Sequence, residues 1–249
     1  MLRIKQALQA KARVAYLTLG DGEFSYENFC ALVDGGVNIL EVGLPFSDPI
    51  SDGEVIQAAM SRALKLGTNF TKSLEIISKI RAKSEVAIIV FTYYNIIQHD
   101  LEKRLKQIAN AGADGMLVVD LPYEEAAEIR ALSNKYNLAL IMVATPSTPL
   151  NRVKLLSNFG DGFLYYACRK GTTGMQDSLS HDTIEQIKRV KAHSSLPVCV
   201  GFGVSSNQMV KQINQISDGC VVGSYFVNQV AANVQLNALT MLAREIFKS

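Results

Sequence analysis

The sequence has few of the residues that build metal and redox centres. Its three histidines (His99, His181 and His193) are far apart and lack ligand spacing, and none of its four cysteines belongs to a C-x-x-C pair. These counts give no indication of a metal site, a redox motif or a disulfide framework. A reducing, cytoplasmic setting fits such cysteine usage best.

Long apolar runs and a strong charge of either sign are also absent. The run at 86–91 is too short to span a bilayer, and residues 1–6 are typical of an amphipathic helix rather than a signal peptide. The net charge is +2, with acids and bases interspersed. We therefore expect neither a nucleic acid nor a membrane as partner.

Short apolar runs alternate with helix-period stretches along all 249 residues, of which 48% are hydrophobic. Eight runs are strand candidates, the number that a closed barrel requires: 14–18, 38–42, 86–91, 115–119, 138–143, 162–167, 197–200 and 219–222. The helical patterns between and after them include 26–33, 55–66, 101–111, 124–135, 181–192 and 234–247. The alternation predicts an α/β fold, a single (β/α)8 TIM barrel domain over residues 1–249 with an extra N-terminal helix. An open doubly wound sheet is the alternative, and the polar residues at so many strand ends favour the barrel.

The stretch 40–53, LEVGLPFSDPISDG, is the most informative in the chain. It takes a buried-type strand into Glu41 and, after a loop shaped by Pro and Gly, reaches Asp52. Two carboxylates at the C-terminal end of a barrel strand suit acid/base chemistry, and burial would raise the pKa of Glu41. The structural alternative is a strand-end carboxylate that caps backbone N–H groups, with Asp52 as a turn residue.

Glycine motifs follow the last two strand candidates. Gly203 belongs to GFG, and Gly223 with Ser224 precedes a short helical pattern at 225–231. Barrels often bind phosphate between these two loops, because glycine allows close approach and a helix start offers free N–H groups. Ordinary tight turns are the other interpretation.

Tyrosines cluster near strand ends (Tyr16, Tyr93, Tyr94, Tyr165 and Tyr166) and could line a pocket for a flat apolar substrate. Strand alternation means that Tyr165 and Tyr166 cannot both face inward. The polar segment 168–180, which follows the sixth strand, is either a mobile lid or a tolerated surface loop.

With these motifs, the chain resembles the tryptophan synthase alpha chain family. The stretch 40–53 is highly specific, and further matches cover essentially the whole chain: LTLGD at 17–21, YYN at 93–95, VDLP at 119–122, GTTG at 171–174, GFG at 201–203 and GS at 223–224. The resemblance implies a (β/α)8 barrel that cleaves indole-3-glycerol phosphate to indole and glyceraldehyde 3-phosphate, a retro-aldol reaction. Glu41 would be the general acid and also the base, Asp52 would accept the indole N–H, and Tyr165 would lie near the substrate glycerol. Gly174, Gly203, Gly223 and Ser224 would hold the phosphate, and Thr173 would help a lid close over Asp52.

The resemblance also implies a partner. The family works with a beta chain, in an alpha-beta-beta-alpha heterotetramer, that uses pyridoxal phosphate to join indole to serine, so no cofactor is expected in this chain. The implied docking face includes Pro45, Asp48, Pro49 and Asn95.

Four residues depart from the family pattern. Glu54 stands in place of Pro, Tyr16 in place of a Phe at the pocket floor, Tyr166 is bulkier than usual, and Lys170 replaces a small residue. Two alternatives stay open: a catalytically weak alpha-like subunit acting mainly as an allosteric activator, and another phosphate-sugar barrel. The synthase of indole-3-glycerol phosphate would place lysines at strand ends, where this chain has Glu, Asp and Tyr.

Overall fold

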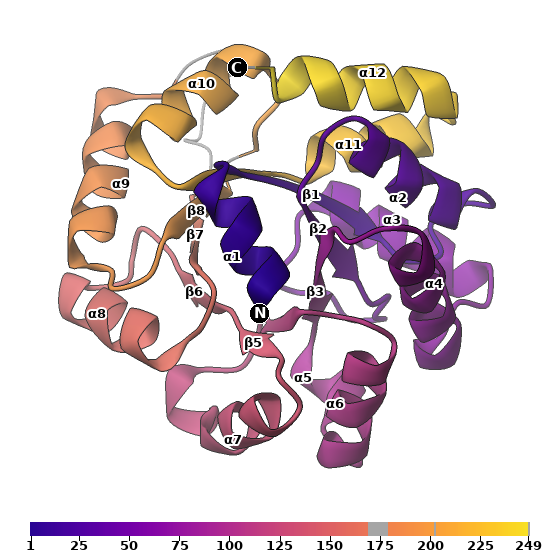
Figure 1. Ribbon diagram of the computed structural model, residues 1–249, viewed down its shortest axis with the longest axis horizontal. Helices are drawn as coiled ribbons and strands as arrows, with labels where there is room; N and C mark the ends of the chain where they lie inside the picture. The colour runs from indigo at the N-terminus through magenta and orange to yellow at the C-terminus, as the bar shows by residue number, and fades with distance from the viewer. Residues whose placement is uncertain (169–178, 202, 249) are drawn as a thin grey trace.

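The computed structural model describes residues 1–168, 179–201 and 203–248, and it forms a parallel β-barrel surrounded by helices (Figure 1). The strands are β1 (Ala12–Thr18), β2 (Ile39–Gly43), β3 (Ala87–Thr92), β4 (Gly115–Val118), β5 (Ala139–Leu140), β6 (Met142–Ala144), β7 (Leu164–Ala167), β8 (Val198–Gly201) and β9 (Gly219–Val222). Strand β1 pairs in parallel with β2 on one side and with β9 on the other, so the first and last strands meet. The predicted (β/α)8 barrel is confirmed.

The fifth strand differs from its prediction as one element over 138–143. It is divided into β5, which pairs with β4, and β6, which pairs with β7. Next to the division, the backbone N–H of Asp161 donates to the Leu140 carbonyl at 2.9 Å, and its carboxylate accepts from the Leu140 N–H at 3.3 Å. The Ile141 N–H still donates to the Met116 carbonyl at 2.8 Å, so β5 and β6 together occupy one position of the barrel.

The helices mostly follow the strands, as a (β/α)8 fold requires. They are α1 (Leu2–Gln9), α2 (Ser25–Asp34), α3 (Glu54–Lys65), α4 (Phe70–Lys83), α5 (Tyr94–Ile97), α6 (Leu101–Asn110), α7 (Ala127–Lys135), α8 (Leu150–Phe159), α9 (His181–His193), α10 (Asn207–Ile216), α11 (Ser224–Ala231) and α12 (Leu236–Ile246). The continuous helix expected at 124–135 is wrong at its start, where a 3₁₀ turn, Tyr123–Glu125, precedes α7. Helices α4, α5, α8 and α10 were not singled out in the sequence, although Asn69 caps α4 by accepting from the Lys72 N–H at 3.0 Å.

The core has an inner and an outer part. Every residue of β2 and β3 is buried, because one face of each strand fills the barrel and the other packs under helices. This double burial explains why β3, AIIVFT, is almost wholly apolar and rich in β-branched residues. No helix in the described part of the chain is long and apolar enough to cross a bilayer.

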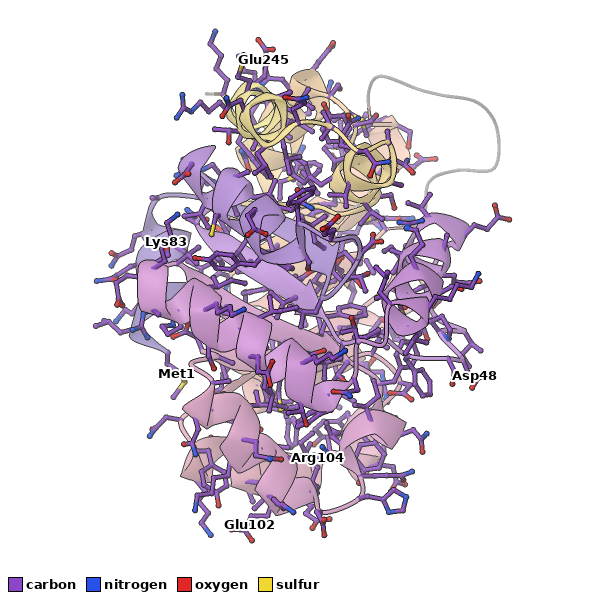
Figure 2. The ribbon with its side chains drawn as sticks, turned by 90° about the vertical axis from the view of Figure 1, so that its right-hand side faces the viewer. Met1, Asp48, Lys83, Glu102, Arg104 and Glu245 are labelled. Carbon is purple, nitrogen blue, oxygen red and sulfur yellow. The ribbon has the colours of Figure 1, made fainter. Side chains whose placement is uncertain are left out.

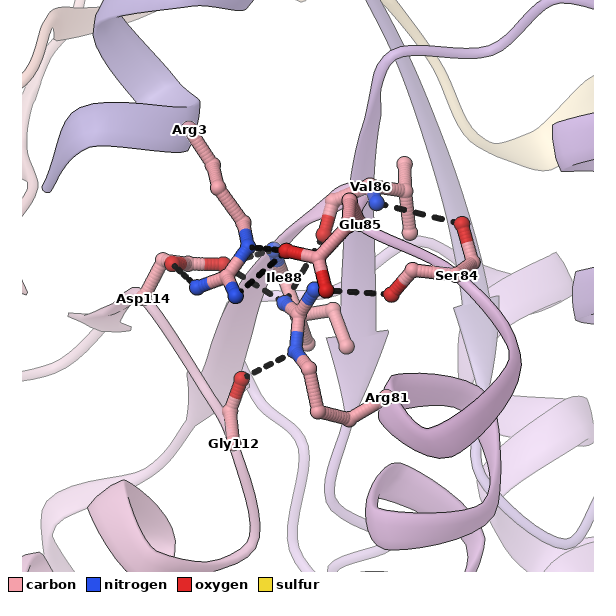
Figure 3. Close-up of polar contacts among 8 residues, drawn as sticks. All are labelled: Arg3, Arg81, Ser84, Glu85, Val86, Ile88, Gly112 and Asp114. Carbon is pink, nitrogen blue, oxygen red and sulfur yellow. Dashed lines mark hydrogen bonds and ion pairs between the residues drawn. The ribbon is translucent and has the colours of Figure 1, made fainter.

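The extra N-terminal helix α1 lies across the end of the barrel at which the strands begin, with Ile4 and Ala7 buried (Figure 1). Beside it, Asp114 accepts hydrogen bonds from Arg3 at 3.1 Å, from Arg81 at 2.7 Å and from the Ile88 N–H at 2.9 Å (Figure 3). Asp114 is only 4% exposed, and two guanidinium groups pair with it in the interior. At the opposite end of the barrel the strands end, and Figure 2 shows Asp48, on the loop after β2, and Met1 on opposite sides of the molecule.

Candidate active site

A cavity of about 220 Å³ lies at the C-terminal ends of the strands. Most of the residues singled out in the sequence line it: Tyr16, Glu41, Asp52, Tyr165, Gly203, Gly223 and Ser224. Side chains from β3, β4, β6 and β9, together with Ile56 of α3, complete an apolar wall. The structure therefore brings two carboxylates, two tyrosines and the glycine motifs into one small space. Thr173 and Gly174 lie outside the described residues.

Glu41 lies in the middle of β2, directly beside Tyr16 of β1 in the barrel register. Its side chain is 1% exposed, and its Oε1 atom has no hydrogen-bond partner in the described part of the chain. Burial without a compensating charge raises the pKa of Glu41 to about 8. The carboxyl group is therefore largely protonated at neutral pH and can act as a proton donor.

Asp52 follows β2 on the loop that leads into α3. The Tyr93 hydroxyl donates to Oδ2 of Asp52 at 2.7 Å and accepts from the Ser51 N–H at 3.1 Å. Burial raises the pKa of Asp52, and the hydrogen bond from Tyr93 opposes that rise by stabilising the carboxylate. The two carboxyl groups thus have different environments, the arrangement that separates an acid from a charge stabiliser.

Tyr93 could not be distinguished from the other strand-end tyrosines by sequence alone. Its ring stacks on Phe46 with centroids 4.9 Å apart, which holds the loop after β3 against the loop after β2. The bond to Asp52 joins residues that are 41 positions apart, so no local pattern could reveal it.

Tyr165 and Tyr166 lie on opposite faces of β7, as alternation predicts. Tyr165 lines the cavity, whereas Tyr166 is buried and absent from its lining. Gly201 leaves room for the Tyr165 hydroxyl, since a β-carbon at that position would lie 2.3 Å from the hydroxyl oxygen.

Tyr16 forms part of the wall between the carboxylates. Its hydroxyl shares a 3.2 Å hydrogen bond with Thr18, and its ring packs edge-on against Phe91. Gly43 leaves room for the Tyr16 hydroxyl, because a β-carbon at residue 43 would lie 2.2 Å from the hydroxyl oxygen.

The glycine motifs form the other end of the cavity. Gly203 has a φ of +42°, which favours glycine, and Gly223 immediately precedes α11. The helix expected at 225–231 begins one residue earlier, at Ser224. Its first N–H groups have no backbone partner in the described chain, so they can donate to an anion.

The expected docking residues lie on the outer rim. Asp48 and Asn95 are exposed, and Pro45 and Pro49 are half-buried. Next to them Ile50 is 85% exposed, a large apolar side chain that the sequence did not single out. Of the four departures, Tyr16 lines the cavity, Tyr166 lies behind it, Glu54 is the exposed first residue of α3, and Lys170 lies outside the described residues.

A second cavity, of about 440 Å³, adjoins the first where the fifth strand is divided. Val119 and Val143 line both cavities and so form part of the wall between them. No group of three or more His, Cys, Asp or Glu side chains that could hold a metal occurs in residues 1–168, 179–201 and 203–248.

Comparison with known proteins adds independent information. The family model described as tryptophan synthase alpha chain matches residues 3–248. A tryptophan synthase alpha chain from Coxiella burnetii is 45% identical over 99% of this chain and 97% of its own length. Tryptophan synthase subunit alpha from Legionella pneumophila has a similar structure, with a TM-score of 0.86, 31% identity and 97% of each chain covered. A chain of the tryptophan synthase complex from Pyrococcus furiosus matches with a TM-score of 0.84 and 31% identity, over 94% of this chain and 95% of that one.

Proposed function

Because the chain belongs to the tryptophan synthase alpha chain family, we propose that it cleaves indole-3-glycerol phosphate to indole and glyceraldehyde 3-phosphate. Its role is that of the alpha subunit in tryptophan biosynthesis, and the enzyme is a lyase. The observation that carries the proposed reaction is Glu41, a buried carboxyl group without a partner on one oxygen, in a cavity shared with Asp52.

Glu41 supplies the proton that the reaction needs first. With a pKa of about 8, its protonated form donates to C3 of the indole ring, which converts the ring into a leaving group. The resulting carboxylate then accepts the proton of the side-chain hydroxyl as the aldehyde forms. The C3–carbon bond breaks in this step, and its electron pair returns to the ring.

Asp52 stabilises the charge that develops on the ring. Protonation at C3 places positive charge on the ring nitrogen, and a carboxylate that accepts the N–H favours that state. Tyr93 occupies Oδ2 of Asp52, so Oδ1 is the oxygen that faces the substrate. Tyr165 packs beside the glycerol, and Gly203, Gly223 and Ser224 with the α11 N-terminus bind the phosphate.

The partner is a tryptophan synthase beta chain, in an alpha-beta-beta-alpha heterotetramer. The rim formed by Pro45, Asp48, Pro49 and Asn95, together with the exposed Ile50, is the docking face. In this assembly pyridoxal phosphate belongs to the beta chain, and the alpha reaction uses carboxyl groups alone. A function as activator alone is not favoured, because activation of a partner does not require a buried carboxyl group at the wall of a cavity.

The test is indole release from indole-3-glycerol phosphate by the purified chain, with and without its beta chain. We expect slow release alone and a sharp rise with the partner. Glu41→Gln should lower the rate of indole release at least about a thousandfold, while the variant still binds and stimulates the beta chain. Stimulation without any release by the natural chain would instead identify an activator, and near-normal turnover by Glu41→Gln would remove the role assigned to Glu41.

A further inference from the structure

Tyr16 lies along the wall of the reaction cavity between two glycines. At the backbone end of its side chain, a β-carbon at Gly223 would lie 3.6 Å from the Tyr16 Cβ atom. At the other end, a β-carbon at Gly43 would lie 2.2 Å from the Tyr16 hydroxyl oxygen. Gly223 belongs to the glycine motifs proposed to bind the phosphate, so the hydroxyl lies at the opposite end of the side chain, toward the part of the cavity left for the substrate ring.

The surroundings of this hydroxyl in the cavity are mainly apolar. In the barrel register Gly43 pairs with Phe91, and Phe91 pairs with Leu117, so the hydroxyl occupies the space that Gly43 leaves in this row of side chains. Phe91 packs edge-on against the Tyr16 ring, with centroids 5.4 Å apart. Both Phe91 and Leu117 line the cavity. One hydroxyl group in an apolar lining fixes the orientation of a ligand that carries a matching polar atom.

Thr18 leaves the Tyr16 hydroxyl able to donate to such a ligand. The two hydroxyl groups share a 3.2 Å hydrogen bond in which either can be the donor, and neither makes another side-chain hydrogen bond within the described ranges. Two hydroxyl groups carry two protons, and their shared bond uses one of them. Tyr16 lines the cavity and Thr18 does not, so when Thr18 donates, the proton of Tyr16 is available to a ligand.

The proposed reaction occupies the five-membered part of the indole ring, with C3 at Glu41 and the N–H at Asp52. The six-membered part is therefore left for the apolar lining and the Tyr16 hydroxyl. We propose that Tyr16 is a specificity-determining residue, whose hydroxyl donates to an oxygen substituent on the six-membered ring, so that the chain also takes hydroxylated indole-3-glycerol phosphates as substrates. This inference deepens the proposed function and rests on it.

Binding of uncleavable analogues to the full chain tests the proposal. The parent analogue is 3-(indol-3-yl)propyl phosphate, which lacks the side-chain hydroxyl that the reaction deprotonates, and the others are its derivatives hydroxylated at each position of the six-membered ring. The chain contains no Trp, so indole fluorescence reports the ligand alone. At least one hydroxylated analogue should bind Tyr16→Phe at least about fivefold more weakly than the natural chain, whereas the Kd of the parent should change less than about twofold.

Thr18→Val is the matched control for Tyr16→Phe. Both substitutions break the same hydrogen bond, and both side chains are almost fully buried, so the two variants should lower Tm by similar small amounts. Only Tyr16→Phe removes a hydroxyl that lines the cavity. Thr18→Val should therefore bind the hydroxylated analogue within about twofold of the natural chain. An equal loss of binding in both variants would show a purely structural effect and overturn the inference.

Tyr165→Phe locates the contact, because Tyr165 is the other tyrosine that lines the cavity. If Tyr165→Phe loses the preference for the hydroxylated analogue and Tyr16→Phe keeps it, the substituent lies at β7 and the inference is overturned. Tight binding of the parent without any effect of Tyr16→Phe on its hydroxylated derivatives would overturn the inference and leave the proposed function standing. If the parent analogue does not bind at all, the proposed function and the inference fail together.

Discussion

The Tyr93 hydroxyl donates a 2.7 Å hydrogen bond to Oδ2 of Asp52, and this bond ties the loop after β3 to the carboxylate on the loop after β2. It lowers the pKa of Asp52 against the rise that burial causes. Tyr93 is thus a positioning residue for the proposed reaction, and its effect should appear in a pH profile.

We expect Tyr93→Phe to lower kcat about 10- to 100-fold, because Asp52 loses the donor that keeps it ionised and oriented. The phenyl ring retains the stack on Phe46, so the loop should keep its place. Without the hydrogen bond the pKa of Asp52 rises further, which moves the acidic limb of the kcat profile to higher pH. Tyr94→Phe, one position away, is the control and should change neither kcat nor the acidic limb of its pH profile.

Glu41 should make stability depend on pH in a predictable direction. Its pKa is about 8 in the folded chain and near 4.5 when exposed, so the folded state binds the extra proton in that window. Stability is therefore lost as pH rises from about 4.5 through 8, by up to about 5 kcal/mol. Urea unfolding of the natural chain and of Glu41→Gln at pH 5 and pH 9 checks this. The free energy of unfolding of Glu41→Gln should rise relative to that of the natural chain between pH 5 and pH 9. If the difference between the two proteins is the same at both pH values, water or a counter-charge reaches the carboxylate.

Ser224→Asp should raise KM for indole-3-glycerol phosphate at least about tenfold, since it places a negative charge beside the substrate phosphate. The substitution should not lower the stability of the folded chain, because an acidic residue in the first turn of α11 interacts favourably with the helix dipole. Ser224→Ala removes only the hydroxyl and should raise KM less. Steady-state kinetics measure KM for both variants, and an unchanged KM in Ser224→Asp would show that the phosphate binds elsewhere.

At the other end of the barrel, Asp114→Asn should destabilise the chain by about 3 kcal/mol, because Arg81 and Arg3 lose their buried counter-charge. Glu85→Gln is the matched control. Glu85 also pairs with Arg3, but it is 80% exposed, so its loss should cost less than about 1 kcal/mol. Urea unfolding measures both, and equal losses would contradict the distinction between buried and exposed partners.

The barrel and much of its site were predictable from the sequence. Buried runs separated by helical patterns indicate parallel strands, and the ends of the runs predict one mouth shared by Glu41, Asp52 and Gly223. Glu41 lies two residues deeper than expected, in the middle of β2, and still faces the cavity. What the sequence did not indicate depends on contacts between distant segments. Asp161 bonds to Leu140 from 21 positions away, and the hydroxyl of Tyr93 reaches Asp52 only after two loops have packed together.

Val119 and Val143 have a consequence for acidity. They line both the cavity that holds Glu41 and the larger one beside the divided fifth strand, so a smaller side chain at either position would join the two spaces. More water around Glu41 would lower its pKa toward that of an ordinary glutamate and leave it ionised when the proposed reaction needs a proton. The proton affinity of Glu41 is therefore a property of the barrel wall as much as of the residue itself.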